Sequence, residues 1–190
     1  MKIELYDVVR LIDISGTENL KPGAVGTVLE QYDKPKTAYE VEFCDSKGFT
    51  IELMAFEQKQ FVLFVTEENI YKLLFKYFPE VYSEYEKESS FYCNENGIMG
   101  HIVFGDLVNN KVLELLETGQ IARIQDYFYF FESMAYSDSE YVHEILVTTV
   151  LWRLGSDSSL KKYMLQKTTT YADTLDKDFD RMRNKNSPLL

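Results

Sequence analysis

A glutamate and a histidine one helical turn apart are the residues of this sequence best spaced for metal chemistry. Glu140 and His143 lie in a segment of helical periodicity, so a helix there places both side chains on one face. Such a pair provides ligands in dimetal bundles, with Glu132 and Glu114 as further candidates. A second pair is required, but His101 has no acid three residues before it. We therefore expect no metal and no cofactor, and keep a metal-dependent enzyme centred on Glu140, His143 and Glu132 as the alternative.

A thiol nucleophile is the second chemistry to consider. Cys93, His101 and Asp106 are close in the sequence, but no nucleophile motif surrounds them. Cys44, the other cysteine, falls in a predicted strand, where a small buried thiol is expected. The sequence also lacks the G-x-S-x-G, P-loop and dinucleotide-binding glycine motifs. We therefore predict that the protein is not an enzyme.

The elements that hold these residues change type at Val65. Before this point apolar and polar residues alternate, most clearly over 39–43, and after it the apolar residues recur every three or four positions. Periods of two and 3.6 residues are typical of strands and helices. The sequence therefore predicts an α+β protein, with a small SH3-like β-barrel at 1–65 and an antiparallel α-helical domain, bundle or HEAT-like, at 66–190.

Glycines mark the turns of the β-rich part. Pro22-Gly23 suits a type II turn, because Pro fixes φ at the second position and Gly accepts a positive φ at the third. Gly26, inside the next apolar run, predicts a bulge or a sharp bend. Residues 45–48 predict a hairpin turn. Five short strands in about 65 residues fit an SH3-like barrel.

The pattern of residues 66–190 predicts a series of successive helices. Thr66 and Ser139 are expected to cap helices, Gly119 to end one, and 89–100 to be irregular around a turn at 94–97. The segment 121–136 is apolar over most of its circumference and should lie at the centre of the domain. A frayed tail is expected at 184–190. The predicted helices cover about 67–78, 80–88, 102–118, 121–136, 140–154, 158–165 and 169–183.

The charge of the chain limits its partners. The sequence holds 20 basic and 31 acidic side chains, which give a net charge of −11, and aromatic residues make up 15%. This charge repels phosphate backbones and anionic lipid and attracts cationic proteins, so we expect neither nucleic acid nor membrane as a partner. The sequence shows no signal peptide and no apolar run of about 18 residues, so we expect a cytoplasmic protein.

Three segments of the β-rich part carry a family resemblance. The runs YDVVRLIDI, LKPGAVGTVLEQYD and AYEVEFCDSKGFTIELM resemble a bacterial domain of unknown function with an SH3-like, KOW-like barrel. The resemblance covers about the first third of the chain. It implies the barrel fold but no activity, because barrels of this shape have many functions.

The helical part carries a second resemblance. The run IQDYFYFFESMAYSDSEYVHEILVTTVLWRL is similar to helical immunity-type proteins of bacterial polymorphic toxin loci. Phe131, Glu132 and Met134 match the end of an aromatic helix, and Trp152-Arg153 departs from the pattern, which commonly has Leu-Glu. The resemblance implies an inhibitor of a cognate toxin and leaves open which residues touch it.

Acidity and tyrosine content favour a protein-binding function. We predict an immunity protein that occludes a cognate, basic, nuclease-type toxin domain, because carboxylates speed encounter with a basic partner and aromatic side chains anchor an interface. A regulatory adaptor that binds peptide or RNA through the barrel is another alternative. The predicted partner-binding residues are Glu84, Tyr85, Glu86, Glu88, Tyr92, Tyr136, Asp138, Glu140 and Tyr141.

Overall fold

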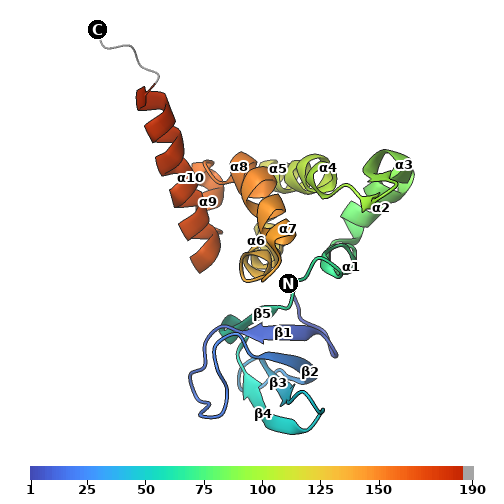
Figure 1. The fold of residues 1–190 in the computed structure, drawn as a ribbon, viewed down its shortest axis with the longest axis vertical. Helices are drawn as coiled ribbons and strands as arrows, with labels where there is room; N and C mark the ends of the chain where they lie inside the picture. The colour runs from blue at the N-terminus through green and yellow to red at the C-terminus, as the bar shows by residue number, and fades with distance from the viewer. Residues whose placement is uncertain (186–190) are drawn as a thin grey trace. The chain divides into compact units, whose positions relative to one another are not determined.

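The computed structural model describes the backbone of residues 1–185 and the side chains of residues 1–181. It divides into two compact units, one of Lys2–Phe64 and one that starts at Val65 and includes Met1. The first unit holds a five-stranded sheet and the second is helical apart from a small hairpin, so the class is α+β (Figure 1). The predicted frayed tail lies, from residue 186 on, outside the described residues.

The sheet of the first unit is antiparallel, with strand order β4-β3-β2-β1-β5. The side chains of Tyr39, Val41 and Phe43 are buried, as the alternation predicts. Strands β4 and β5 are the two edges and do not pair with each other, so the sheet in the described chain is open rather than a closed barrel. The elements are β1 (Val8–Leu11), β2 (Val25–Tyr32), β3 (Ala38–Cys44), β4 (Thr50–Phe56), the short 3-10 helix η1 (Gln58–Gln60) and β5 (Phe61–Leu63).

Gly26 permits a close approach between β2 and β3. A Cβ atom at this buried position would lie 2.7 Å from both the carbonyl oxygen of Glu42 and Cγ1 of Val41. The bulge predicted at Gly26 lies instead between Val28 and Glu30, where the register of β2 against β3 shifts. The glycine is therefore required by packing, and its position in the sequence did not locate the bulge.

Cys44 is exposed, so the prediction of a buried thiol was wrong. It follows the buried Phe43 at the end of β3, and alternation along a strand points it to the opposite face. The predicted turn at Pro22-Gly23 is confirmed, because Gly23 has φ +87° and the Ala24 N–H donates to the carbonyl of Lys21 at 3.0 Å.

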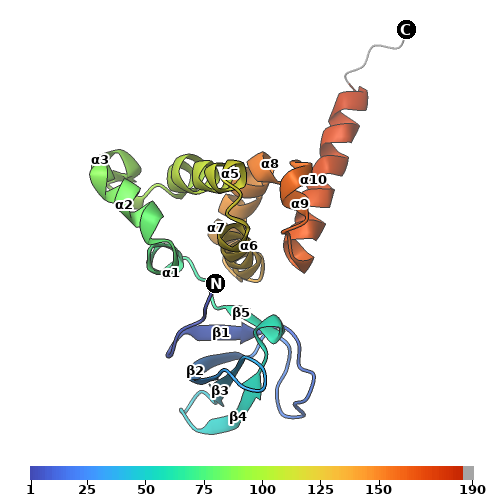
Figure 2. The ribbon, with the colours of Figure 1, turned by 180° about the vertical axis from the view of Figure 1, so that it is seen from behind.

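The described part of the helical unit contains four short helices, a hairpin and four longer helical stretches, two of which include a π-helical segment. Figure 1 and Figure 2 show these helices from two sides. No helix in the described range is long and apolar enough to cross a bilayer. In chain order the elements are α1 (Ile70–Tyr77), α2 (Pro79–Lys87), α3 (Ser89–Tyr92), β6 (Cys93–Asn94), β7 (Gly97–Ile98), α4 (Gly100–Ile102), η2 (Val103–Val108), α5 (Asn109–Glu117), α6 (Ile121–Ala135), α7 (Glu140–Ile145), η3 (Leu146–Leu151), α8 (Trp152–Leu154), α9 (Ser158–Lys161) and α10 (Gln166–Lys185).

Several predicted helix ends are confirmed and others were wrong. The hydroxyl of Ser139 accepts from the Val142 N–H and caps α7, and Gly119 has φ +69° after α5. Thr66 does not cap α1, because its N–H donates to Oδ1 of Asn69 and the helix begins only after that turn. The segment predicted to be irregular holds α3 and the hairpin β6–β7, with its turn where expected.

Helix α6 lies at the centre of the helical unit, as its apolar circumference predicts. It packs against α5, α7 and α10. A helix with this many buried side chains must be covered on most sides. Its buried residues are Ile124, Tyr127, Phe128, Phe130, Phe131, Glu132, Ser133, Met134 and Ala135.

Candidate protein-interaction surface

Helix α2 and helix α3 present acidic and aromatic side chains to solvent. Of the residues of α2, only Val81 is buried, so most of its circumference is available for contacts. Pro79 occupies the first helical position, where its missing N–H costs no hydrogen bond. We call the exposed residues Tyr82, Glu84, Glu86, Glu88 and Phe91 the α2–α3 surface.

The aromatic residues of the α2–α3 surface belong to a series of contacting rings. Tyr82 is 39% exposed and Phe91 55% exposed, while the Tyr92 ring beneath them is buried. Rings held by their neighbours lose little side-chain entropy when a partner binds. The ring centroid distances are 5.2 Å for Phe75–Tyr82, 4.8 Å for Phe75–Tyr85, 6.0 Å for Tyr85–Tyr92 and 5.1 Å for Phe91–Tyr92.

The charge of the α2–α3 surface is negative at neutral pH. Lys87 Nζ lies 2.7 Å from Glu84 Oε1, and this hydrogen bond lowers the pKa of the Glu84 carboxyl. The hydroxyl of Tyr82 donates to Glu86 at 2.6 Å, which raises the pKa of the phenol. Together with Glu88, the three exposed carboxylates outnumber the single lysine, so this surface favours a basic partner.

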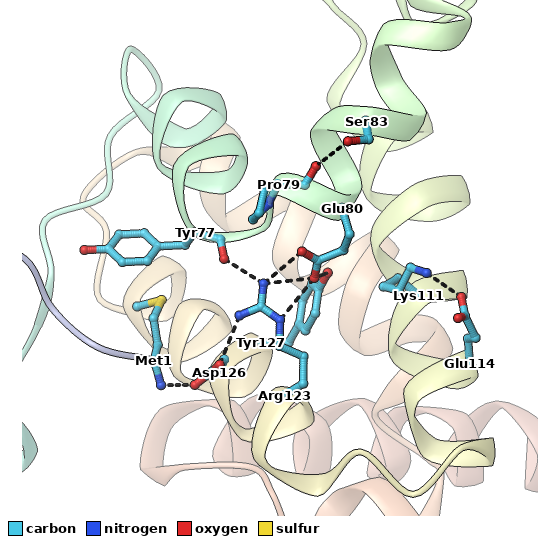
Figure 3. Close-up of polar contacts among 10 residues, drawn as sticks. All are labelled: Met1, Tyr77, Pro79, Glu80, Ser83, Lys111, Glu114, Arg123, Asp126 and Tyr127. Carbon is cyan, nitrogen blue, oxygen red and sulfur yellow. Dashed lines mark hydrogen bonds and ion pairs between the residues drawn. The ribbon is translucent and has the colours of Figure 1, made fainter.

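An arginine on α6 holds α2 in place (Figure 3). The guanidinium of Arg123 binds both carboxylate oxygens of Glu80, with Nη2 2.9 Å from each. It also donates to Asp126 at 3.0 Å and to the carbonyl oxygen of Tyr77 at 2.7 Å. The Tyr127 hydroxyl donates to Glu80 at 2.8 Å. A bidentate pair with further hydrogen bonds fixes geometry as well as energy, so α2 is well anchored on α6.

The electrostatics of this anchor follow from partial burial. Burial raises the pKa of the Glu80 carboxyl, but the hydrogen bonds from Arg123 and Tyr127 outweigh it, so that the net pKa is lowered. Burial and the charge of Glu80 raise the pKa of the Tyr127 phenol. The amino group of Met1 pairs with Asp126 (Figure 3). No local pattern predicts the Glu80–Arg123 contact, because 43 positions separate the two residues.

The second group of predicted residues lies around the start of α7. Asp138 and Glu140 are exposed, and Tyr136 is half-buried with Lys167 Nζ 4.0 Å from its ring centroid. Tyr141 is half-buried, and its hydroxyl lies 2.5 Å from that of Tyr71 on α1. Tyr141 therefore points toward α1, whereas Tyr136 lies beside a residue of α10.

The hairpin β6–β7 connects the two groups. The hydroxyl of Tyr85 shares a hydrogen bond with Cys93 Sγ at 3.0 Å, which together with burial raises the pKa of Tyr85 to about 12. Cys93 pairs with Ile98 across the hairpin, and the carbonyl oxygen of Ile98 accepts from Tyr71 at 3.5 Å. The structure thus brings Tyr85 and the Tyr71–Tyr141 pair against the same hairpin.

The residues of the alternative metal centre have other partners. Glu132 is buried, and its oxygens accept from the N–H groups of Lys167 and Thr168 at 2.7 and 2.9 Å, so it caps α10. His143 Nε2 donates to the carbonyl oxygen of Ala135 at 3.2 Å. Among the residues with described side chains, no group of three or more histidines, cysteines and acids is arranged to hold a metal ion.

The histidine considered for thiol chemistry lies in α4 and belongs to a contact between the two helical stretches that include π-helical segments. His101 Nδ1 lies 2.6 Å from Thr149 Oγ1, while Cys93 Sγ shares a hydrogen bond with the Tyr85 hydroxyl. Asn109 donates to the carbonyl oxygen of Thr149 at 3.0 Å, and Arg153 donates to that of Gly105 at 3.1 Å. Each segment thus supplies a carbonyl to a side chain of the other stretch. His101 therefore helps to join two helices.

The fold and surface define a two-part protein in which a helical unit carries an acidic, aromatic face. Each of the two parts matches a known protein family model. Residues 5–63 match a domain of unknown function, DUF4926, and residues 71–177 match another, DUF7674. Since the second match covers more than half of the chain, the protein belongs to the DUF7674 family. Searches of curated proteins and of solved structures find no match.

Proposed function

We propose that this protein is a cytoplasmic immunity protein, which binds the basic catalytic domain of a bacterial toxin and blocks it by occlusion. The observation that carries the proposal is the α2–α3 surface, where Tyr82 and Phe91 are exposed among three glutamates. The resemblance of residues in α6 and α7 to immunity-type proteins supplies the class of partner.

Charge supports a basic partner. The chain carries a net charge of −11, and three of its exposed carboxylates lie on the α2–α3 surface. Complementary charge raises association rates by about 10- to 1,000-fold and does so most strongly at low salt. A nuclease-type domain, which must hold phosphates, presents the basic face that such a surface fits.

The anchoring of α2 supports a binding function as well. The Arg123 contacts fix the backbone of α2 on α6, and the ring contacts hold Tyr82 and Phe91 in place. A surface that is ordered before binding loses less entropy on association. Aromatic side chains in the middle of a charged surface are the usual anchors of tight interfaces.

The test is protection in cells and binding in solution. The toxin domain is the C-terminal region of the large secreted protein that the proposal places immediately upstream of this gene, and the absence of such a neighbour contradicts the proposal. The variant Glu84→Lys, Glu86→Lys, Glu88→Lys should slow association at least about ten-fold at low salt. It should also weaken protection when the toxin domain is co-expressed.

A matched variant controls for total charge. Glu18, Glu117 and Glu144 are exposed glutamates that are not part of the α2–α3 surface, and their replacement by lysine changes the net charge equally. This control should retain protection, with an association rate within about three-fold of the wild type. Equal protection by both triple variants would refute the α2–α3 surface as the binding site, and failure of the wild-type protein to bind the toxin domain would refute the function.

A further inference from the structure

A cavity of about 450 Å³ lies beside the hairpin in the helical unit. Its wall is formed by the hairpin, the start of α4, the residue Glu67 and the side chain of Tyr141 on α7. Its volume lies within the range of about 300–1,000 Å³ in which small-molecule sites fall. The cavity is thus large enough for a partner's side chain.

Gly100, which lines the cavity, is packed closely against neighbouring side chains. A Cβ atom at the buried Gly100 would lie 2.5 Å from the hydroxyl of Tyr71 and 2.6 Å from that of Tyr141. Any larger residue would therefore displace these phenols, one of which belongs to Tyr141 in the cavity lining. At the rim, Oδ1 of Asn94 accepts from the N–H of Asn96 at 2.8 Å, which holds the Asn94 amide in position. The site is therefore shaped by specific contacts.

The chemistry of the lining suits a cation. Among the described residues that line the cavity, Glu67 is the only carboxylate and His101 the only basic side chain, and Nδ1 of His101 lies 2.6 Å from Thr149 Oγ1. Tyr141 adds an aromatic ring, and Asn94 and Asn96 add amide groups. Carboxylates and aromatic faces both attract guanidinium groups, and a planar guanidinium can use several acceptors at once. An anion would meet Glu67 and no fixed positive charge.

The hydroxyl of Tyr141, which lines the cavity, is paired with that of Tyr71. The two hydroxyls are 2.5 Å apart, so one donates to the other. Burial, the hydrogen bond with Tyr141 and the charge of Glu67 all raise the pKa of Tyr71, so the Tyr71 phenol is neutral at physiological pH. The Tyr71 phenol therefore adds no negative charge beside the cavity, and the Glu67 carboxylate is the lining group that favours a cation.

We propose that this cavity receives an arginine side chain of the partner protein. The inference rests on the proposed function, because it names the partner group that binds beside the α2–α3 surface. The hairpin connects the α2–α3 surface to the cavity, since Cys93 shares a hydrogen bond with Tyr85 of α2 and its strand partner Ile98 lines the cavity. A single basic partner can then contact both.

A small probe tests the cavity without the partner. The full chain, labelled with nitrogen-15, is titrated with N-acetyl-arginine amide and, in parallel, with the neutral isostere N-acetyl-citrulline amide. The arginine probe should give saturable amide shifts centred on residues 94–101, and the citrulline probe should bind at least about five-fold more weakly. Equal binding of the two probes, or shifts centred elsewhere, would overturn the proposal.

Two neighbouring glutamates provide matched variants. Glu67→Gln removes the carboxylate of the cavity and should weaken the arginine probe about five-fold, while Glu68→Gln, outside the lining, should leave it unchanged. Equal affinities of these two variants would contradict the assignment. The titration with the arginine probe uses no toxin domain, so its result is independent of the proposed function. Binding of the arginine probe without protection in cells would refute only the proposed function. Protection in cells without binding of the arginine probe would refute only this inference.

Discussion

Replacing Glu132 by alanine should release α10 from the rest of the helical unit. The side chain of Glu132 on α6 is 2% exposed, and it accepts hydrogen bonds from the Lys167 N–H, the Thr168 N–H and the Thr168 hydroxyl. The first N–H groups of a helix have no partner within that helix, and its dipole places positive charge there. Glu132 satisfies both needs of α10 at once.

The expected loss of stability follows from these three contacts. Removal of a helix cap costs about 0.5–2 kcal/mol, and a hydrogen bond to a charged group contributes about 1.5–3 kcal/mol. Because water can reach the exposed first residue of α10, the individual values do not add fully. We expect Glu132→Ala to lower the free energy of unfolding by about 3–5 kcal/mol, because two backbone N–H groups and the Thr168 hydroxyl lose their charged acceptor. Glu132→Gln keeps the shape and should cost about 2 kcal/mol.

The fluorescence of a native tryptophan can measure whether α10 is packed against the rest of the helical unit. Trp152 is the only tryptophan, and its ring centroid lies 4.4 Å from that of Phe179 on α10. Its fluorescence should therefore change when α10 separates, and circular dichroism follows the helices as a whole. With a urea dependence of about 1–3 kcal/mol per molar, a loss of about 3 kcal/mol lowers the midpoint by about 1–3 M.

The control is Glu144→Ala, which removes an exposed glutamate of the same unit. It should shift the tryptophan midpoint by less than a few tenths of a molar, since surface substitutions change stability by about 0.5 kcal/mol or less. If Glu132→Ala unfolds at the wild-type urea concentration, or if the two variants lose equal stability, then the capping of α10 by Glu132 is not what holds this helix.

Three other local features of the molecule should respond to single changes. Burial raises the pKa of the Glu80 carboxyl, but the Arg123 contacts outweigh burial and lower the pKa below 4.5. The ionised Glu80 carboxylate therefore stabilises the folded state above pH 4.5, and this stabilisation is lost as the pH falls through the folded-state pKa. The urea-midpoint difference between the wild type and Glu80→Gln should shrink from about pH 6 to about pH 3, and a constant difference contradicts it. Gly26→Ala should destabilise the sheet unit by about 1–3 kcal/mol in thermal unfolding, because its Cβ would meet β3; an unchanged midpoint refutes the packing argument. Cys44 is exposed, so it should react with a thiol reagent about ten-fold faster than the half-buried Cys93, and Cys44→Ala should remove the fast phase; equal rates would be inconsistent with their burial.

The local pattern of apolar and polar residues was sufficient to predict the types of secondary structure in each part of the chain. The change from alternation to helical periodicity at Val65 correctly predicts the α+β class, and the apolar circumference of 121–136 correctly places α6 at the centre. These predictions succeed because period and burial are properties of neighbouring residues. The capping role of Ser139 and the turn at Gly23 succeed for the same reason.

Contacts between distant residues were beyond such patterns. The bond between Thr168 and Glu132 spans 36 positions, and Arg123 meets Glu80 across 43. Cys44 was assigned to the wrong face because the alternation of its strand was not extended to the strand's end. The two long-range contacts depend on which element packs alongside, and the spacing of residues within one segment does not specify that neighbour.

The amino-acid sequence by itself determined the two kinds of structure, the negative charge and the abundance of aromatic side chains. Only the tertiary structure decided what each carboxylate does: Glu80 anchors α2, Glu132 caps α10, Glu67 lines a cavity and Glu84 faces solvent. The four side chains are chemically identical. Their roles differ because burial and hydrogen-bond partners, which come from residues far away in the chain, set the energy of each charge.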